Sequence, residues 1–245
     1  TSKQYASLGT VNTLLANIYA WLGGLTHERE YWEQAEHYAS EVIDGKSGVY
    51  DLESMDGLIS NVFGKARNSV ETIYCIDNNP LDVDRKWWYN FVVELPGQML
   101  MSYPYTTTDE AEIASLAEDY WDERTKITVE TVENIYPEEE DARRREFWYE
   151  LGTLTYPVYE WDEETGDAIE VGRDITPYAH IAKWRDPIYQ ESEEVAYDRP
   201  VIATDGDWVV WRLADLILLR AECRVNLDIA TAVNDLNTVR HRAEL

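Results

Sequence analysis

The sequence predicts a mainly α-helical protein, built on pairs of antiparallel helices with loops and a few short strands between them. Helical spacing of apolar residues near both ends of the chain and short β-branched, aromatic runs in the middle predict this class. The third observation is an apolar content of 44% in 245 residues. A chain of this size and composition can bury a sizeable core, which argues against disorder.

Residues 208–243 carry the strongest helical pattern. In the second half, apolar residues recur at three- and four-residue steps and so share one side of a helix; they are Ile229, Ala232, Val233, Leu236, Val239 and Ala243. A polar break precedes them, and Asp228 stands where its side chain can cap the second helix. We therefore expect two helices here, of about the length of a tetratricopeptide repeat, roughly 34 residues.

A second helix pair is predicted over residues 10–44. Val11, Leu14 and Ile18 mark a helix that ends at Gly23-Gly24, and apolar residues from Tyr31 onward mark a partner helix. Helix pairs at both ends of a chain are typical of a helical-repeat protein whose units stack on one another.

Between the helix pairs the pattern changes to short strands. The run 71–76 is β-branched and aromatic, which predicts a strand. Alternation over 154–161 and 168–171 predicts a β-hairpin closed by Gly166 in the left-handed conformation. The acidic loop 162–167 within it is compatible with a turn or with calcium ligation, and the turn is favoured because the spacing of a known calcium loop is missing.

The chain is strongly acidic. It holds 48 acidic and 21 basic residues, a formal charge of −27. Such a surface repels phosphate backbones and anionic lipids, so we expect no nucleic-acid partner and no direct binding to a membrane surface. Cys75 and Cys223 lie far apart in apolar segments, which favours buried free thiols, and no metal-ligand spacing is present.

The aromatic residues predict the ligand class. The sequence has 10 Trp and 17 Tyr but only 3 Phe, a bias toward rings with a polar edge, whose faces suit the C–H face of a sugar. The candidate ligand-binding residues are Arg85, Trp87, Trp88, Tyr89, Asn90, Tyr103 and Tyr105. In this interpretation the rings at 87–89 stack on the ligand while the polar residues beside them donate hydrogen bonds. Burial of these rings in a core or in loop packing is the alternative.

The sequence contains no motif that indicates catalysis as the aromatic residues indicate ligand binding. The four histidines are scattered, and no nucleophile motif or phosphate-binding loop is present. A glycosidase needs two carboxylates across a cleft, but 48 acidic residues make any one pair uninformative. Asp141 with Arg143, and Arg212 with Asp215, are interpreted as structural ion pairs.

Several motifs, taken in order, resemble the SusD/RagB family of outer-membrane nutrient-binding lipoproteins. The resemblance rests on the early helix pair, the strand 71–76, the stretch Leu95-Pro96-Gly97-Gln98-Met99-Leu100, Asp141-Ala142-Arg143, His180-Ile181-Ala182-Lys183-Trp184, and Arg212-Leu213-Ala214-Asp215 through Arg240-His241-Arg242-Ala243. The family typically has Asp-Pro-Arg where this chain has alanine at the middle position.

The resemblance implies an α-α superhelix of tetratricopeptide-like helix pairs, with a ligand-loop region at about 77–206 in a single domain, residues 1–245. It also implies a non-catalytic protein on the surface of the outer membrane that delivers oligosaccharide, or sometimes peptide, to a SusC-like TonB-dependent transporter. No cofactor is implied, although relatives sometimes bind calcium. We expect this chain to be a fragment that lacks the lipid-anchored N-terminal region and a C-terminal segment. The alternatives are a peptide-binding helical-repeat protein and, less favoured, an α-helical glycoside hydrolase.

Overall fold

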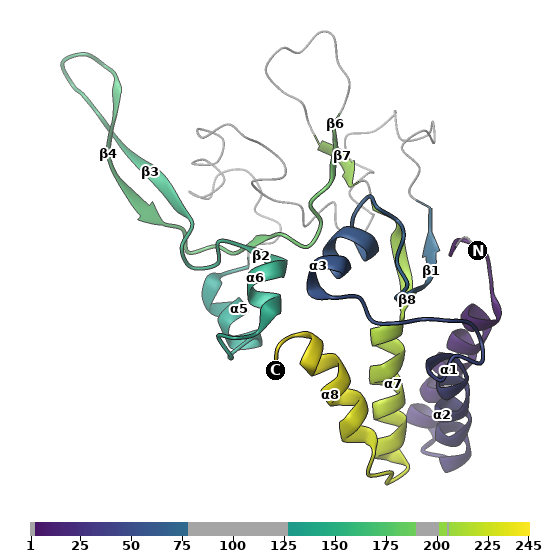
Figure 1. Ribbon diagram of the computed structural model, residues 1–245. Helices are drawn as coiled ribbons and strands as arrows, with labels where there is room; N and C mark the ends of the chain where they lie inside the picture. Colours follow the sequence, from purple (N-terminus) through teal and green to yellow (C-terminus); the bar gives the residue numbers. More distant parts are fainter. Residues whose placement is uncertain (1–2, 78–126, 190–200, 205) are drawn as a thin grey trace. The chain divides into compact units, whose positions relative to one another are not determined.

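The structure is a computed structural model that describes residues 3–77, 127–189, 201–204 and 206–245 (Figure 1). The chain divides into two compact units. Unit 1 comprises Thr1–Asp82 and Asp205–Leu245, and unit 2 comprises Val83–Thr204. No helix in the described part of the chain is long and apolar enough to cross a membrane.

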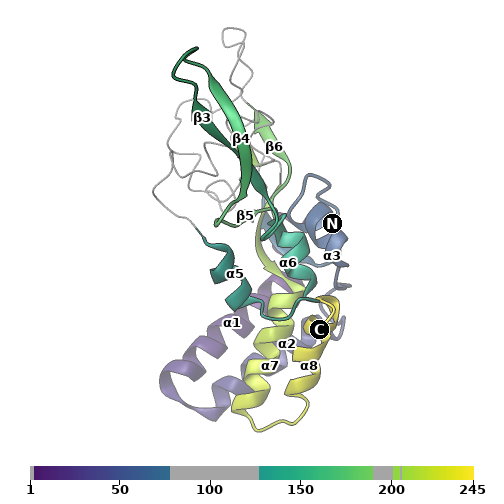
Figure 2. The same ribbon diagram turned by 90° about the vertical axis from the view of Figure 1, so that its left-hand side faces the viewer.

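Four helices form the body of unit 1: α1 (Leu8–Thr26), α2 (Arg29–Ile43), α7 (Leu213–Asn226) and α8 (Ala232–Arg242). In Figures 1 and 2 they lie side by side, with α2 packed on α7 so that the two terminal pairs join. The prediction that helix pairs from both ends of the chain stack on each other is confirmed, and so is the mainly helical fold class.

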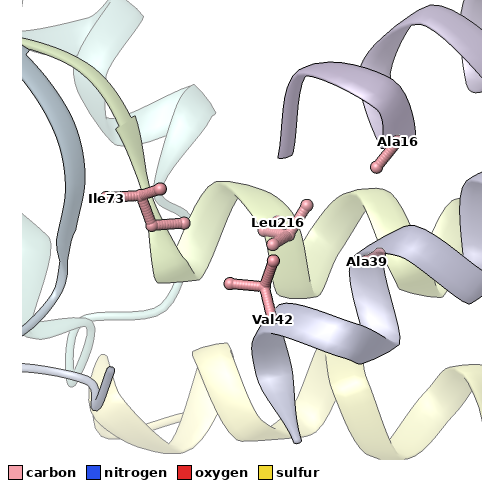
Figure 3. Packing of buried hydrophobic residues seen from close by; sticks show 5 residues of the cluster. All are labelled: Ala16, Ala39, Val42, Ile73 and Leu216. Carbon is pink, nitrogen blue, oxygen red and sulfur yellow. The ribbon is translucent and has the colours of Figure 1, made fainter. Parts of the chain in front are cut away.

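Small and branched residues fill the junction between the pairs. One buried cluster consists of Ala16, Ala39, Val42, Ile73 and Leu216. Figure 3 shows Leu216 of α7 and Val42 of α2 pointing toward one another, and it places Ala39 on α2 and Ala16 on α1 in the same cluster. A second cluster continues along the same helices, with Trp32 and Cys223 among its members. Alanine contributes little side-chain volume, so the helix backbones approach closely.

The first helix differs from its predicted end. It begins at Leu8, where Ser7 caps it, and continues through Gly23 to Thr26; His27 then takes the left-handed conformation with φ 60°. Gly23 lies inside the helix. A glycine is needed at this position because a Cβ would come within 2.8 Å of the Trp32 ring. This glycine therefore serves helix packing and does not end the helix.

The apolar residues that marked this helix do not form its buried face. Val11, Leu14 and Ile18 are all 44% exposed or more. The buried side carries small residues instead: Gly9, Thr10, Asn12, Thr13, Ala16, Ala20 and Gly23. The helix period was correctly predicted from the apolar residues, but the close approach of α2 selects the small ones for burial.

The C-terminal pair also starts differently from its prediction. Residues Trp208–Arg212 form strand β8, and the helix begins only at Leu213. β8 pairs antiparallel with β1 (Thr72–Ile76), the strand expected at 71–76. The prediction of helix for 208–212 is wrong because these β-branched and aromatic residues find an open partner strand. Asp228 does not cap α8: it has φ 60°, and Thr231 occupies the N-cap position without a side-chain hydrogen bond.

Between α2 and β1 the chain makes one short helical segment, α3 (Met55–Gly57), which continues directly as the π-helix η1 (Leu58–Val62). Its apolar residues are buried within unit 1, and Leu58 and Val62 are almost fully enclosed. This segment fixes the path by which the chain returns to β1.

In its described residues, unit 2 combines two short helices with two-stranded sheets. The helices are α5 (Val129–Ile135) and α6 (Ala142–Phe147). The strands are β2 (Trp148–Tyr149), β3 (Thr155–Trp161), β4 (Ala168–Ile175), β5 (His180–Ile181), β6 (Pro187–Tyr189) and β7 (Val201–Thr204). They pair as β2 with β5, β3 with β4 and β6 with β7, all antiparallel. The predicted hairpin is β3–β4, with Gly166 at φ 74° as expected.

Candidate functional site

The predicted ligand-binding residues lie outside the described part of the chain. These residues are Arg85, Trp87, Trp88, Tyr89, Asn90, Tyr103 and Tyr105. Their role stays a prediction, and nothing in the described geometry brings them together or separates them. What the structure does describe is the strand from which this stretch departs, β1, and the groups that hold it.

A buried carboxylate fixes the start of β1. The Glu71 side chain is fully buried and accepts hydrogen bonds from Arg212 Nη1 at 3.0 Å and from Arg242 Nη1 at 2.8 and 2.9 Å. It also accepts from the backbone N–H of Glu53 at 2.9 Å. One carboxylate thereby joins β1 to β8, to the end of α8 and to the loop after α2. Because Arg–carboxylate bonds are directional, the cluster sets where β1 begins.

A second ion cluster holds the helices of unit 1. Asp235 of α8 accepts from Arg220 Nε and Nη2 at 3.0 and 2.7 Å, a bidentate contact, and from Arg224 Nη1 at 2.9 Å. Arg224 also donates to Glu36 of α2 at 2.9 Å. The expected Arg212–Asp215 pair is present as well, at 3.1 Å. The charged residues of α7 and α8 therefore tie these two helices to each other and to α2.

A cavity of about 310 Å³ opens beside β1 within unit 1. Its lining includes Lys3, Asn61, Arg67, Ser69 and Asp207. Arg67 contacts Asp207 and Asp77, with N–O distances of 3.5 Å to each. The Lys3 ammonium lies 4.2 Å from the centre of the Tyr50 ring. Burial lowers the pKa of Lys3. The charges that line this cavity are therefore largely matched by partners from the same unit.

Both cysteines are buried free thiols, as predicted. Burial raises the pKa of Cys75 to about 12, with a further rise from Asp207, whose Oδ2 lies 3.5 Å from the sulfur. Burial likewise raises the pKa of Cys223 to about 12. A nucleophilic cysteine must be a thiolate near neutral pH, so neither residue is equipped for covalent catalysis.

In unit 2 the Asp-Ala-Arg motif is a structural ion pair, in line with its interpretation. The Asp141 side chain caps α6 by accepting from the Arg143 backbone N–H at 2.9 Å, and the Arg143 guanidinium binds both of its oxygens. The hydrogen bonds with Asp141 raise the pKa of Arg143. The guanidinium also lies 4.8 Å from the centre of the Tyr136 ring.

The acidic loop 162–167 is a hydrogen-bonded turn. The Asp162 carboxylate accepts from the backbone N–H groups of Glu164 and Thr165, and the Asp162 N–H donates to the carbonyl of Asp167. Among residues 3–77, 127–189 and 206–245, no group of three His, Cys, Asp or Glu side chains is arranged to hold a metal ion. The described geometry therefore supports the turn interpretation of this loop.

Two exposed aromatic residues on the hairpin were not singled out from the sequence. Trp161 is 76% exposed and Tyr159 is 46% exposed. Both belong to β3 and are two residues apart, so they lie on the same face of the strand. The alternation of aromatic and acidic residues at 159–163 was the available signal, but it was used only to predict the hairpin.

Comparisons with known proteins agree with the fold. A family model described as the SusD family matches residues 61–245. Among solved structures, the chain is similar to a SusD homolog from Bacteroides thetaiotaomicron VPI-5482, with a TM-score of 0.64 and 17% identity over 100% of this chain. It is also similar to NanU of B. fragilis (TM-score 0.55, 16% identity, 99% of this chain) and to a SusD superfamily protein from Parabacteroides distasonis ATCC 8503 (0.53, 22%, 100%). Comparison with curated proteins gives no match.

The chain spans less than half the length of these similar structures, covering 44%, 44% and 46% of them in the same order. At identities of 22% and below, the similarity shows the fold alone. Family membership rests on the match over 61–245, which includes the strand β1, the Asp-Ala-Arg motif and the whole of α7 and α8.

Proposed function

Because the chain belongs to the SusD family, we propose that it is a non-catalytic binding protein that holds an oligosaccharide at the surface of the outer membrane. It delivers this ligand to a SusC-like TonB-dependent transporter. The single observation that carries the proposal is the family match over three quarters of the chain, residues 61–245. The buried, protonated thiols and the structural use of Asp141 and Arg143 are consistent with a protein that binds without catalysing a reaction.

Within this proposal the ligand contacts Trp87, Trp88 and Tyr89, with Arg85 and Asn90 donating hydrogen bonds. Tyr103 and Tyr105 add a second pair of rings. Support comes from the strand that precedes residues 85–105. The hydrogen bonds of Glu71 with Arg212 and Arg242 fix β1, so the chain enters this segment from a fixed strand. A ring that stacks on a ligand face contributes about 1 to 3 kcal/mol.

The experiment is isothermal titration calorimetry of the chain against a panel of neutral oligosaccharides. We expect binding of at least one glycan and a loss of about tenfold in affinity in Trp88→Ala, which corresponds to one stacked ring. Trp21→Ala is the matched control, since Trp21 is a 71% exposed tryptophan on α1, far from β1 in the sequence, and its removal should leave the affinity unchanged. Absence of binding across the panel, or equal losses in both variants, would contradict the proposal.

A second candidate, a helical-repeat protein that binds peptide, is favoured by one observation. The outer side of α1 exposes Leu8, Val11, Leu14, Ile18, Trp21 and Leu25, each at least 44% accessible. An apolar helix side of this size is typical of a surface that packs against another protein element. Under this candidate Trp21→Ala, and not Trp88→Ala, would weaken binding in a calorimetric titration with peptides in place of oligosaccharides.

A further inference from the structure

The β3–β4 hairpin exposes an unusual amount of its surface. All eight residues of β4 are exposed, and in the described part of the chain neither strand pairs with a third strand. Its length is about 25 Å, from the rise of a strand per residue. A two-stranded sheet without a covering element is only marginally stable in water. Within the described part of the chain no strand extends this sheet, and pairing with a further strand would stabilise it.

Apolar side chains occur on both faces of this hairpin. Tyr159 and Trp161 share one face of β3, and Trp161 lies opposite Ala168 of β4. Ile169, which is 49% exposed, lies opposite Glu160 and therefore belongs to the other face. A sugar that stacks on the ring of Trp161 would contact one face of the hairpin. An added strand carries side chains on both faces of the sheet, so a protein segment can contact apolar residues on both faces.

The open edges of the hairpin are not equivalent. Pro157 lies in the middle of β3 and has no N–H, so the outer edge of β3 lacks a donor at that position. β4 contains no proline from Ala168 to Ile175, and its outer edge keeps its backbone donors and acceptors. A bulge at Val171 of β4, between the pairs Val158–Gly172 and Tyr159–Glu170, interrupts this edge and leaves regular pairing on both sides of it. An added extended segment would therefore pair with β4.

The charge of the hairpin selects the chemistry of that segment. Residues 155–175 contain seven acidic residues and one basic residue, Arg173. Arg173 is used within the hairpin, since its Nε donates to Thr155 Oγ1 at 3.2 Å and its Nη1 lies 3.6 Å from Glu170. The field at this surface is strongly negative, which repels nucleic acid, anionic lipid and a second copy of this acidic chain. It attracts lysine and arginine side chains.

From these observations we propose that the β3–β4 hairpin is a docking surface for an extended, lysine- or arginine-rich segment of a partner protein, which lies along β4 and places cations beside the ring of Trp161 and the carboxylates at 162–167. Cations bind favourably over the face of tryptophan, and complementary charge raises the rate of association. The proposal uses none of the residues of the oligosaccharide contacts proposed above, and it does not depend on them.

The test uses the whole 245-residue chain and a capped octapeptide of alternating lysine and valine, titrated calorimetrically at low and at physiological salt. The peptide of alternating glutamate and valine is the probe control. We expect binding of the lysine peptide only, weakened by salt. Glu163→Lys with Glu164→Lys should reduce the affinity about tenfold at low salt, and Trp161→Ala should reduce it roughly threefold. Both glutamates lie in the turn, whose backbone N–H groups donate to the side chains of Asp162 and Thr165.

Glu139→Lys with Glu140→Lys is the matched control, because it makes the same charge change on exposed residues of unit 2 outside the hairpin. This variant should bind the peptide as the unchanged chain does. The proposal is overturned if the lysine peptide does not bind, or if both double variants lose affinity equally, which would indicate attraction to overall charge. It is also overturned if sedimentation shows that the hairpin joins two copies of the chain, or if Trp161→Ala abolishes oligosaccharide binding and leaves peptide binding intact.

Discussion

Removal of the Glu71 carboxylate should be the most damaging single change in unit 1. In Glu71→Ala the guanidinium groups of Arg212 and Arg242 lose their shared partner, and these side chains are only 19% and 11% exposed. The Nε of Arg242 is already buried without a hydrogen-bond partner among the described residues, so this arginine relies on its contacts with Glu71. The Glu53 N–H also loses its acceptor.

The size of the effect follows from these contacts. Breaking a buried ion pair by removal of one partner costs about 3 to 5 kcal/mol, because an uncompensated charge stays buried. We expect Glu71→Ala to lower the free energy of unfolding by about 4 kcal/mol, which corresponds to a fall in Tm of roughly 8 to 16 °C for a chain of this size. Glu71→Gln keeps the shape and some hydrogen bonds, so its loss should be about half as large.

Scanning calorimetry with urea denaturation measures both variants, and the control is Glu33→Ala. Glu33 also forms an ion pair with an arginine, Arg29, at 3.0 Å, but the two side chains are 55% and 59% exposed. Exposed pairs of this spacing contribute about 0.3 to 0.5 kcal/mol, so the control should lose little. The reasoning is refuted if Glu71→Ala and Glu33→Ala destabilise the chain equally, or if Glu71→Gln is as harmful as Glu71→Ala.

Three further predictions concern packing and titration. Gly23→Ala should destabilise the chain by about 1 to 3 kcal/mol, because the new methyl group meets the Trp32 ring at 2.8 Å. Gly24→Ala should stabilise the chain by roughly 0.5 to 1 kcal/mol, because a methyl group there has no neighbour within 4 Å. Thermal unfolding measured by circular dichroism compares the two variants. Burial raises the pKa of both cysteine thiols to about 12, so they should resist a thiol reagent at pH 8 and react once guanidinium unfolds the chain; rapid labelling of the native chain would contradict this. Burial lowers the pKa of His180, so the unfolded chain binds its proton more readily, and stability should fall as the pH drops below about 6.5. His180→Gln should reduce that slope in urea titrations at successive pH values.

The sequence predicted those parts of the fold whose pattern is local. Apolar spacing located both helix pairs, and the β-branched run located β1. The turn at Gly166 followed from the residues themselves, because a left-handed turn favours glycine. The pairing of Asp141 with Arg143 was also predictable, since the two residues are neighbours in the chain and fit one another bidentately.

The candidate site was predictable only as a set of residue types. An excess of Trp and Tyr indicates a ligand class, and consecutive rings at 87–89 indicate a place in the chain, but which rings face a ligand is decided by loop conformation. The cluster around Glu71 could not be predicted from its partners, since Arg212 and Arg242 lie 141 and 171 residues away. An acidic residue at the start of an apolar strand was its only local sign.

The sequence alone determined the helical period, the class of the fold and the strong negative charge, because periodicity and charge are properties of neighbouring residues and of composition. Tertiary structure decided which side of each helix is buried. On α1 it buried Gly9, Thr13 and Ala16 and left Val11 and Leu14 outside, because the distance between packed helices, and not hydrophobicity, sets the size of the side chains between them. It also made a strand of Trp208–Arg212, because a backbone edge offered by β1 outweighs a helical pattern that is only five residues long.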